Sequence, residues 1–120
     1  MKRCYFTNYK NRNILTLNFS NLSRKDIFKL LDESRLFISK QPKNSVLSLI
    51  NITNLKYDID TVNAFKEYIN NTENYVLASA IFGASFFEGM AIEKFSQSIS
   101  IPIKICKSEL EAKSWLLNVK

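Results

Sequence analysis

Apolar and polar residues alternate near the start of the chain. The stretch "ILTLNF" at 14–19 places Thr16 and Asn18 between apolar residues, and a period of two predicts a strand with one buried face. The stretch "CYFTNY" at 4–9 precedes it, and the two are separated by "KNRN". A connection of four residues that contains asparagine is typical of a β-hairpin. The chain is therefore expected to open with a hairpin.

Further along, short apolar runs alternate with segments of helical spacing. "VLSLI" at 46–50 and "YVLASAIF" at 75–82 have the composition of strands that are buried on both faces. "IPIKIC" at 101–106 carries the proline and the outward lysine of an edge strand. Apolar residues at helical spacing predict helices over about 24–41, 60–70, 84–96 and 109–119.

This element order, ββαβαβαβα, predicts an α/β fold with a mixed, mostly parallel five-stranded sheet. A length of 120 residues with 46% hydrophobic residues suits one domain over 1–120. The longest apolar stretch covers about 13 residues, whereas a membrane-spanning helix needs about 20. Because the N-terminus has no export signal, we expect a cytoplasmic protein.

The net charge of +6 comes from the N-terminal part of the chain, where six bases precede the first acid, Asp26. Aromatic residues lie among these bases, and this mixture would suit nucleic-acid binding. The same charges would also protect an exposed strand edge against pairing with other chains. We favour edge protection and keep nucleic-acid binding as a weaker alternative.

Few side chains offer catalytic chemistry. The chain has no histidine, and Cys4 and Cys106 lie at opposite ends, so zinc sites and Cys–His pairs cannot be built from it. Both cysteines are expected to be free, buried thiols. Asp58 and Asp60 invite the interpretation of a catalytic carboxylate pair. We favour the alternative that one caps a helix and the other stabilises its positive end, and we expect no catalytic residue, metal or cofactor.

Three segments resemble a known family. "DIDTVNAFKEYI" at 58–69, "YVLASAIFGAS" at 75–85 and "ELEAKSWL" at 109–116 are similar, in this order and spacing, to STAS-type domains. The resemblance is to small bacterial STAS/SEC14-like proteins, which are also described as anti-sigma-factor-antagonist-like. It implies a non-catalytic regulatory or protein-interaction module. Its SEC14-like side implies, as the alternative, a carrier or sensor that binds a small apolar or lipid-like ligand.

The phosphorylation motif of STAS regulators is altered in this chain. Those regulators carry Asp-Ser-Ser/Thr-Gly after the third strand, and its second hydroxyl accepts the phosphate. The matching stretch here is Ile59-Asp60-Thr61-Val62. Thr61 stands near the acceptor position, but Asp60 replaces the preceding hydroxyl and the glycine is missing. We therefore predict that Thr61 is not a phosphoacceptor and that a partner meets Asp60 as a permanent negative charge.

The predicted site is the carboxyl edge of the sheet, where open α/β sheets bind their partners. Gly83 would form either an anion-binding turn or a tight strand-to-helix turn, and we favour the tight turn. An apolar pocket under Phe86 or Phe87 would favour a ligand, and an exposed patch at 57–61 over a filled core would favour a protein partner. The predicted surface comprises Asn54, Tyr57, Asp58, Asp60, Thr61, Gly83, Ser85, Phe86 and Phe87.

Overall fold

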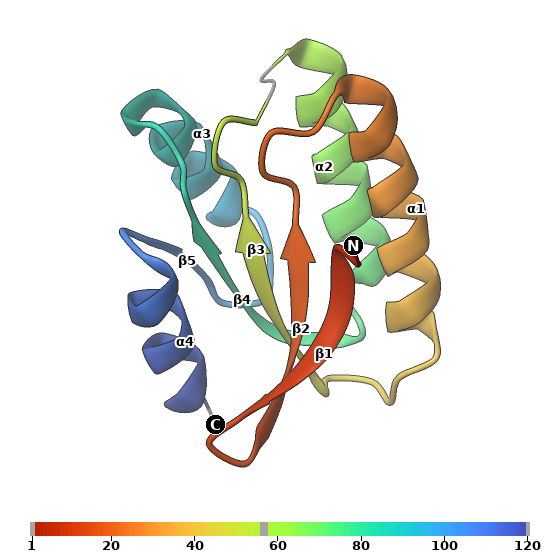
Figure 1. Cartoon of the computed structure of the whole chain (residues 1–120), viewed down its shortest axis with the longest axis vertical. Coiled ribbons are helices and arrows are strands. Elements are labelled where there is room, and N and C mark those ends of the chain that lie inside the picture. Colours follow the sequence, from red (N-terminus) through yellow and green to blue (C-terminus); the bar gives the residue numbers. More distant parts are fainter. Residues whose placement is uncertain (1, 56–57, 120) are drawn as a thin grey trace.

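The structure, a computed structural model, describes residues 2–55 and 58–119, apart from the side chains of Phe86 and Phe87. Figure 1 shows one α/β domain in which five strands and four helices follow the predicted order. The strands are β1 (Cys4–Tyr9), β2 (Arg12–Asn18), β3 (Val46–Asn51), β4 (Val76–Phe82) and β5 (Ile103–Cys106). The helices are α1 (Arg24–Ser39), α2 (Ile59–Thr72), α3 (Phe86–Ser96) and α4 (Glu109–Leu117).

The N-terminal hairpin is tighter than its sequence predicted. β1 and β2 pair antiparallel up to Tyr9 and Arg12, so the turn consists of Lys10 and Asn11 alone. Both residues have positive φ, 47° and 70°, as a type I′ turn requires. The twist of that turn matches the right-handed twist of the strands, which explains why pairing extends further than the expected four-residue connection would allow.

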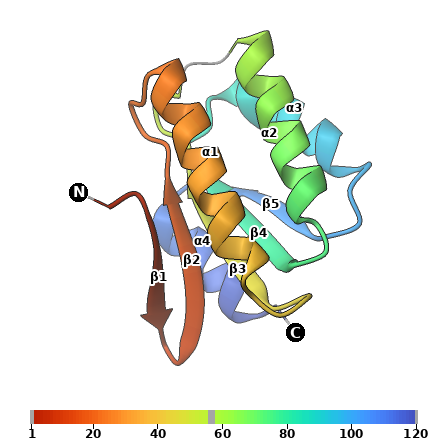
Figure 2. The same cartoon turned by 90° about the vertical axis from the view of Figure 1, so that its right-hand side faces the viewer.

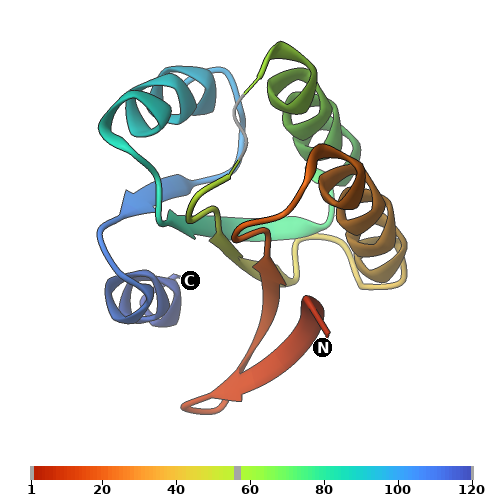
Figure 3. The same ribbon diagram turned by 45° about the horizontal axis from the view of Figure 1, so that its top comes forward.

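The handedness of the connections determines which helices share a face. The strand order is β1-β2-β3-β4-β5, and β2 to β5 run parallel. Each crossover therefore advances in the same direction, and right-handed crossovers that do so place their helices on one face. Figure 3 shows α1, α2 and α3 on one side of the sheet and α4 on the other. Among the strands that the structure describes, the order never reverses, so these strands form no crevice of the switch-point kind.

Each face of the sheet has its own apolar core. Leu15 and Leu17 of β2 point to the three-helix side, together with Ile50 and Ile81. Ile14 points to the other side, toward the core that contains Ala112 and Leu116 of α4. β2 is thus buried on both faces around Ile14 and Leu15, although its alternation had predicted one buried face. The cause is α4, which extends across the sheet as far as β2.

Arg12 connects the hairpin to α4. Its guanidinium donates hydrogen bonds to the carbonyls of Leu116 and Leu117, at 3.4 and 3.3 Å, and to that of Val119. The last carbonyls of a helix have no partner within the helix, and a cation there also offsets the helix dipole. Arg12 therefore stabilises the C-terminal end of α4.

Candidate functional site

A cavity lies between α2 and α3 on the three-helix side of the sheet. α1 and α2 pack side by side (Figure 2), whereas α3 packs on β5. The space that remains between α2 and α3 has a volume of about 480 Å³. Ligand pockets in proteins typically measure about 300–1,000 Å³. The cavity is therefore large enough for a small organic molecule.

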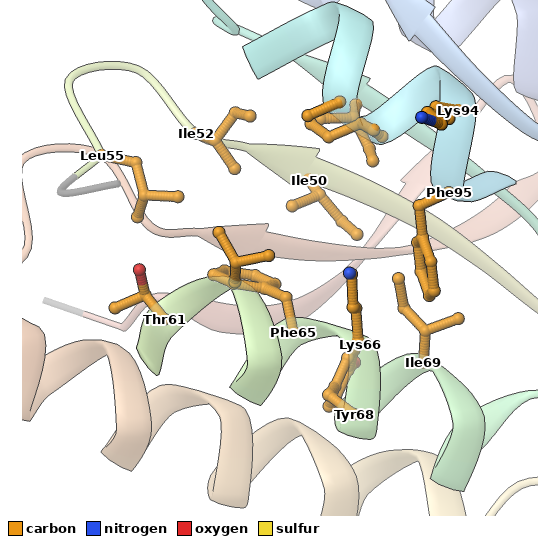
Figure 4. Close-up of a pocket in the computed structure, with 14 residues that line it drawn as sticks. Ile50, Ile52, Leu55, Thr61, Phe65, Lys66, Tyr68, Ile69, Lys94 and Phe95 are labelled. Atoms are coloured by element: carbon orange, nitrogen blue, oxygen red, sulfur yellow. The ribbon is translucent and has the colours of Figure 1, made fainter. Parts of the chain in front are cut away.

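The wall of this pocket is mainly apolar (Figure 4). The strands supply Ile50, Ile52 and Ile81 as its floor. The pocket-facing side of α2 consists of Val62, Phe65 and Ile69, and α3 contributes Ile92 and Phe95. The helical spacing of these α2 residues predicted the helix over 60–70, and such spacing does not show whether the apolar face meets a pocket or the core.

α3 packs loosely for so apolar a helix. None of its described side chains is fully buried, and Met90 is 57% exposed. Ile92 and Phe95 are half-buried and face the pocket. Protein interiors are normally packed as densely as organic crystals, so apolar side chains that face an open space leave contacts unmade. A ligand in this space would supply those contacts.

Among the residues that the structure describes, the charged ones on the pocket wall are both lysines, Lys66 of α2 and Lys94 of α3. Both are exposed, so their aliphatic stems line the mouth while their ammonium groups reach water. The Nζ atom of Lys66 lies 5.6 Å from the centre of the Phe95 ring. Among the described residues, no acid forms a salt bridge with either lysine.

Tyr68 contributes its ring to the pocket wall. The residue is buried, and burial raises the pKa of its hydroxyl well above the usual range. Its hydroxyl has no hydrogen-bond partner among the described residues. It lies near Ser34 of α1, whose own hydroxyl donates to the Leu31 carbonyl at 3.1 Å, so the polar end of Tyr68 is on the α1 side. The tyrosine therefore stays neutral near pH 7 and serves the pocket as an apolar surface.

At the carboxyl edge of the sheet, Asp58 and Thr61 form a capping box at the start of α2. The Thr61 N–H donates to Oδ1 of Asp58 at 2.8 Å, and the Asp58 N–H donates to Oγ1 of Thr61 at 3.0 Å. The Thr61 N–H is the main cause that lowers the pKa of Asp58. Thr61 is 1% exposed, and its hydroxyl donates to the Asp58 carbonyl at 2.9 Å. The capping role expected for one of the two aspartates is thus observed at Asp58.

Asp60 forms a salt bridge with Arg24 of α1. Both side chains are about half exposed, at 56% and 52%, so the pair lies in water at the surface. Arg24 offsets the negative charge that we expected Asp60 to present, and nothing in the sequence connected these two residues. Beside them, Ile59 is 74% exposed.

Two matching motifs form the edge beside these acids. Residues 18–21 read Asn-Phe-Ser-Asn and residues 51–54 read Asn-Ile-Thr-Asn, and their first asparagines are partners in the β2–β3 register. In each motif the first asparagine accepts hydrogen bonds from the N–H and hydroxyl two residues later, at 2.6–3.0 Å. The last asparagines join the motifs, since Nδ2 of Asn54 donates to Oδ1 of Asn21 at 3.0 Å. The side chain of Asn54 is therefore hydrogen-bonded within this edge of the sheet. The repeated four-residue pattern was the feature of the sequence that could have indicated these paired turns.

Gly83 forms the tight turn that was favoured for it. Its φ is +89°, and an added Cβ would lie 2.3 Å from Oγ1 of Thr53. Ser85 then caps α3, because it accepts from the Glu88 N–H at 3.3 Å and donates its own N–H to Glu88 at 2.8 Å. Tyr57 and the side chains of Phe86 and Phe87, which sequence analysis also assigned to the surface, lie outside the described residues.

Two arginines of the basic N-terminal segment have structural partners. Arg3 donates to the carbonyls of Asn18 and Ser20 at 3.1 and 2.8 Å, and Arg12 caps α4. β1 itself contains no charged residue. Of the six early bases, Lys2, Arg3 and Lys10 lie beyond the ends of this edge strand, Arg12 is in β2, and Arg24 and Lys25 begin α1. Fewer cations are therefore available to bind phosphates than the sequence suggested.

The described residues contain no group of three or more histidine, cysteine or acidic side chains that could hold a metal ion. No helix within the described residues combines the length and the apolar character that crossing a membrane would require.

Cys4 and Cys106 are free and buried, as the sequence predicted. Burial, together with the charge of Glu33, raises the pKa of Cys4 to about 12, and burial also raises the pKa of Cys106. At pH 8 we expect Cys4 to react with a maleimide at least about a hundredfold more slowly in the native protein than in urea, because only the thiolate is reactive. Mass spectrometry of a Cys106→Ala variant measures Cys4 alone, and rapid native labelling would contradict the prediction.

The fold is that of a SpoIIAA-like α/β domain, the fold of STAS proteins. Its defining features are the mixed sheet with strands in sequence order, three helices on one face and a single helix on the other. An uncharacterised DUF3478-family protein from Shewanella loihica PV-4, described as having a SpoIIAA-like fold, is similar to this chain with a TM-score of 0.73. The match covers 94% of this chain and 91% of that one at 14% identity, which confirms the predicted fold and nothing finer. No family model and no curated protein matches the sequence.

Proposed function

We propose that this protein is a non-catalytic STAS-like module that binds a small apolar or lipid-like ligand in the pocket between α2 and α3. The observation that carries this proposal is the cavity of about 480 Å³ with its apolar wall. Our criterion for a ligand was an apolar pocket under Phe86 or Phe87, whose side chains lie outside the described residues. The pocket lies along α3, which contributes Ala91, Ile92, Lys94 and Phe95 to its described wall.

A protein-interaction module remains the second candidate. Ile59 favours it, since this large apolar side chain is 74% exposed beside the Asp60–Arg24 pair. Thr61 belongs both to this region and to the pocket wall. A ligand-binding pocket and a partner surface would therefore meet at the start of α2, as a sensor requires.

Catalysis is not part of the proposal. The chain has no histidine, and its two thiols are buried with raised pKa values. The carboxylates at the sheet edge cap α2 or pair with Arg24. None of these groups has the neighbours that activate a nucleophile or a general base.

A pocket-filling variant tests the proposal. We expect the protein to bind a neutral apolar dye such as Nile red. Ala91→Trp should weaken binding at least about tenfold, because Ala91 is an exposed residue on the pocket wall and the larger ring would occupy the space. Asn63→Trp is the matched control, since Asn63 is exposed on α2 outside the pocket wall.

Native mass spectrometry of the protein from its own host then separates the two candidates. A bound small molecule that is lost in Ala91→Trp supports the ligand, and a bound protein that persists in that variant supports the interaction module. Dye affinity that is equal in the two tryptophan variants and the original protein would refute the pocket.

A further inference from the structure

We propose that the ligand of this pocket is an amphiphile with one anionic end. Its anionic group is held by Lys66 and Lys94, and its apolar chain runs along the pocket toward Leu55. This inference rests on the proposed function and adds to it the charge and the direction of the ligand.

The direction follows from where the lining residues lie. Figure 4 shows Lys66, Lys94 and Phe95 at one end of the pocket, and Leu55 and Thr61 at the other. The two lysines come from different helices that face each other across the mouth. Lys66 reaches the Phe95 ring of the opposite helix, and Phe95 is next to Lys94 in the chain. The pocket is therefore polar at one end and apolar along its length.

The sign of the charge follows from the partners of these lysines. In the described part of the chain, the charged residues on the pocket wall are both cationic, and neither takes part in a salt bridge. The acids next to them in sequence, Glu67 and Glu93, are not on the pocket wall. Binding an anion would thus bring opposite charges together at the mouth, whereas a cationic ligand would be repelled.

The position of Lys94 would also be expected of an ordinary surface lysine. Lys94 lies in the last turn of α3, where a cation also complements the helix dipole. That role does not explain Lys66, which lies in the middle of α2 and extends toward α3 (Figure 4). Complementing a helix dipole also gives no preference between anionic and neutral ligands. Comparing ligands that differ only in the head group therefore distinguishes an anion site from ordinary surface lysines.

The experiment compares three ligands with the same chain: decanoate, methyl decanoate and decyl phosphate. The affinity of each is measured by its displacement of Nile red from the 120-residue protein. We expect decanoate to bind at least about fivefold more tightly than its methyl ester, the effect of one to two exposed ion pairs. The order of decanoate and decyl phosphate shows whether the site suits a carboxylate or the phosphate of a lipid head group.

Charge-reversed variants locate the selectivity. Lys66→Glu/Lys94→Glu should lose the preference for decanoate over its methyl ester. Lys29→Glu/Lys43→Glu changes the net charge equally at exposed positions outside the pocket wall, and it should keep the preference. Equal affinity for decanoate and ester in the original protein, or a preference that survives in Lys66→Glu/Lys94→Glu, would overturn this inference and leave the pocket itself in place. Failure of the dye and all three ligands to bind would instead refute the proposed function.

Discussion

A Gly83→Ala variant is expected to lose about 2–5 kcal/mol of unfolding free energy in a denaturant titration. The φ of +89° at Gly83 lies in the region where a side chain costs about 1–2 kcal/mol. The added Cβ would also lie 2.3 Å from Oγ1 and 2.7 Å from the backbone nitrogen of Thr53. The backbone must move to relieve such a contact, at a typical cost of about 1–3 kcal/mol.

Gly89→Ala provides the control for this prediction. Gly89 lies within α3, and its added Cβ would meet Ile105 at an ordinary contact distance of 3.7 Å. Alanine is the better helix former, so this variant should be unchanged or more stable by up to about 1 kcal/mol. A Gly83→Ala variant as stable as Gly89→Ala would show that the turn after β4 is not conformationally restricted.

Phe19→Ala is expected to destabilise the protein by about 3–5 kcal/mol, the usual cost of removing a buried phenylalanine ring. Phe19 is fully buried, and its ring packs edge-on against Phe65 at a centroid distance of 4.9 Å. Denaturant titration measures the loss, and Leu36→Ala is the control because Leu36 is 65% exposed. A loss below about 1.5 kcal/mol for Phe19→Ala would contradict this assignment of the core.

Phe65 extends the consequence of that substitution to the pocket. Phe65 forms part of the pocket wall, and its ring packs against the ring of Phe19. Removing the Phe19 ring should therefore loosen the wall as well as the core. Weaker dye binding by the folded Phe19→Ala variant would reveal this connection.

The sequence predicted the fold because local patterns determine it. Period-two alternation, short apolar runs and helical spacing located the nine elements that the described residues form, and their alternating order predicted the mostly parallel sheet. The prediction of a four-residue hairpin connection was wrong, because the turn contains only Lys10 and Asn11. Lys10 and Asn11 both adopt positive φ, and a conformation of this kind is difficult to infer for a lysine.

The pocket could not be predicted in the same way. Val62, Phe65 and Ile69 produce the same apolar stripe whether another helix covers them or a cavity does, because spacing reports a direction and not a distance. The separation of α2 from α3 depends on how α3 rests on β5, which is a tertiary property. The pair between Asp60 and Arg24 joins residues 36 positions apart and likewise has no local signal.

The edge of the sheet was predicted in part. Asp58 has the capping role that its position before a helix indicated, and Gly83 has the tight turn. The paired asparagine motifs were visible as a repeat, yet their meaning depends on β2 and β3 being neighbours in register. A repeat of four residues acquires a structural role only once the sheet order is known.

The contact between Arg12 and α4 has a consequence for the time course of folding. Every strand pairs with its neighbours in the sequence, so most of the sheet can form as the chain is synthesised. Arg12, in contrast, bonds carbonyls 104 and 105 residues later. At about 5–20 residues per second, Arg12 is synthesised roughly 5–20 s before these partners exist. Until α4 is made, it cannot cover the face that contains Ile14, Leu49 and Ala80, and exposed apolar surface of this kind favours aggregation during folding.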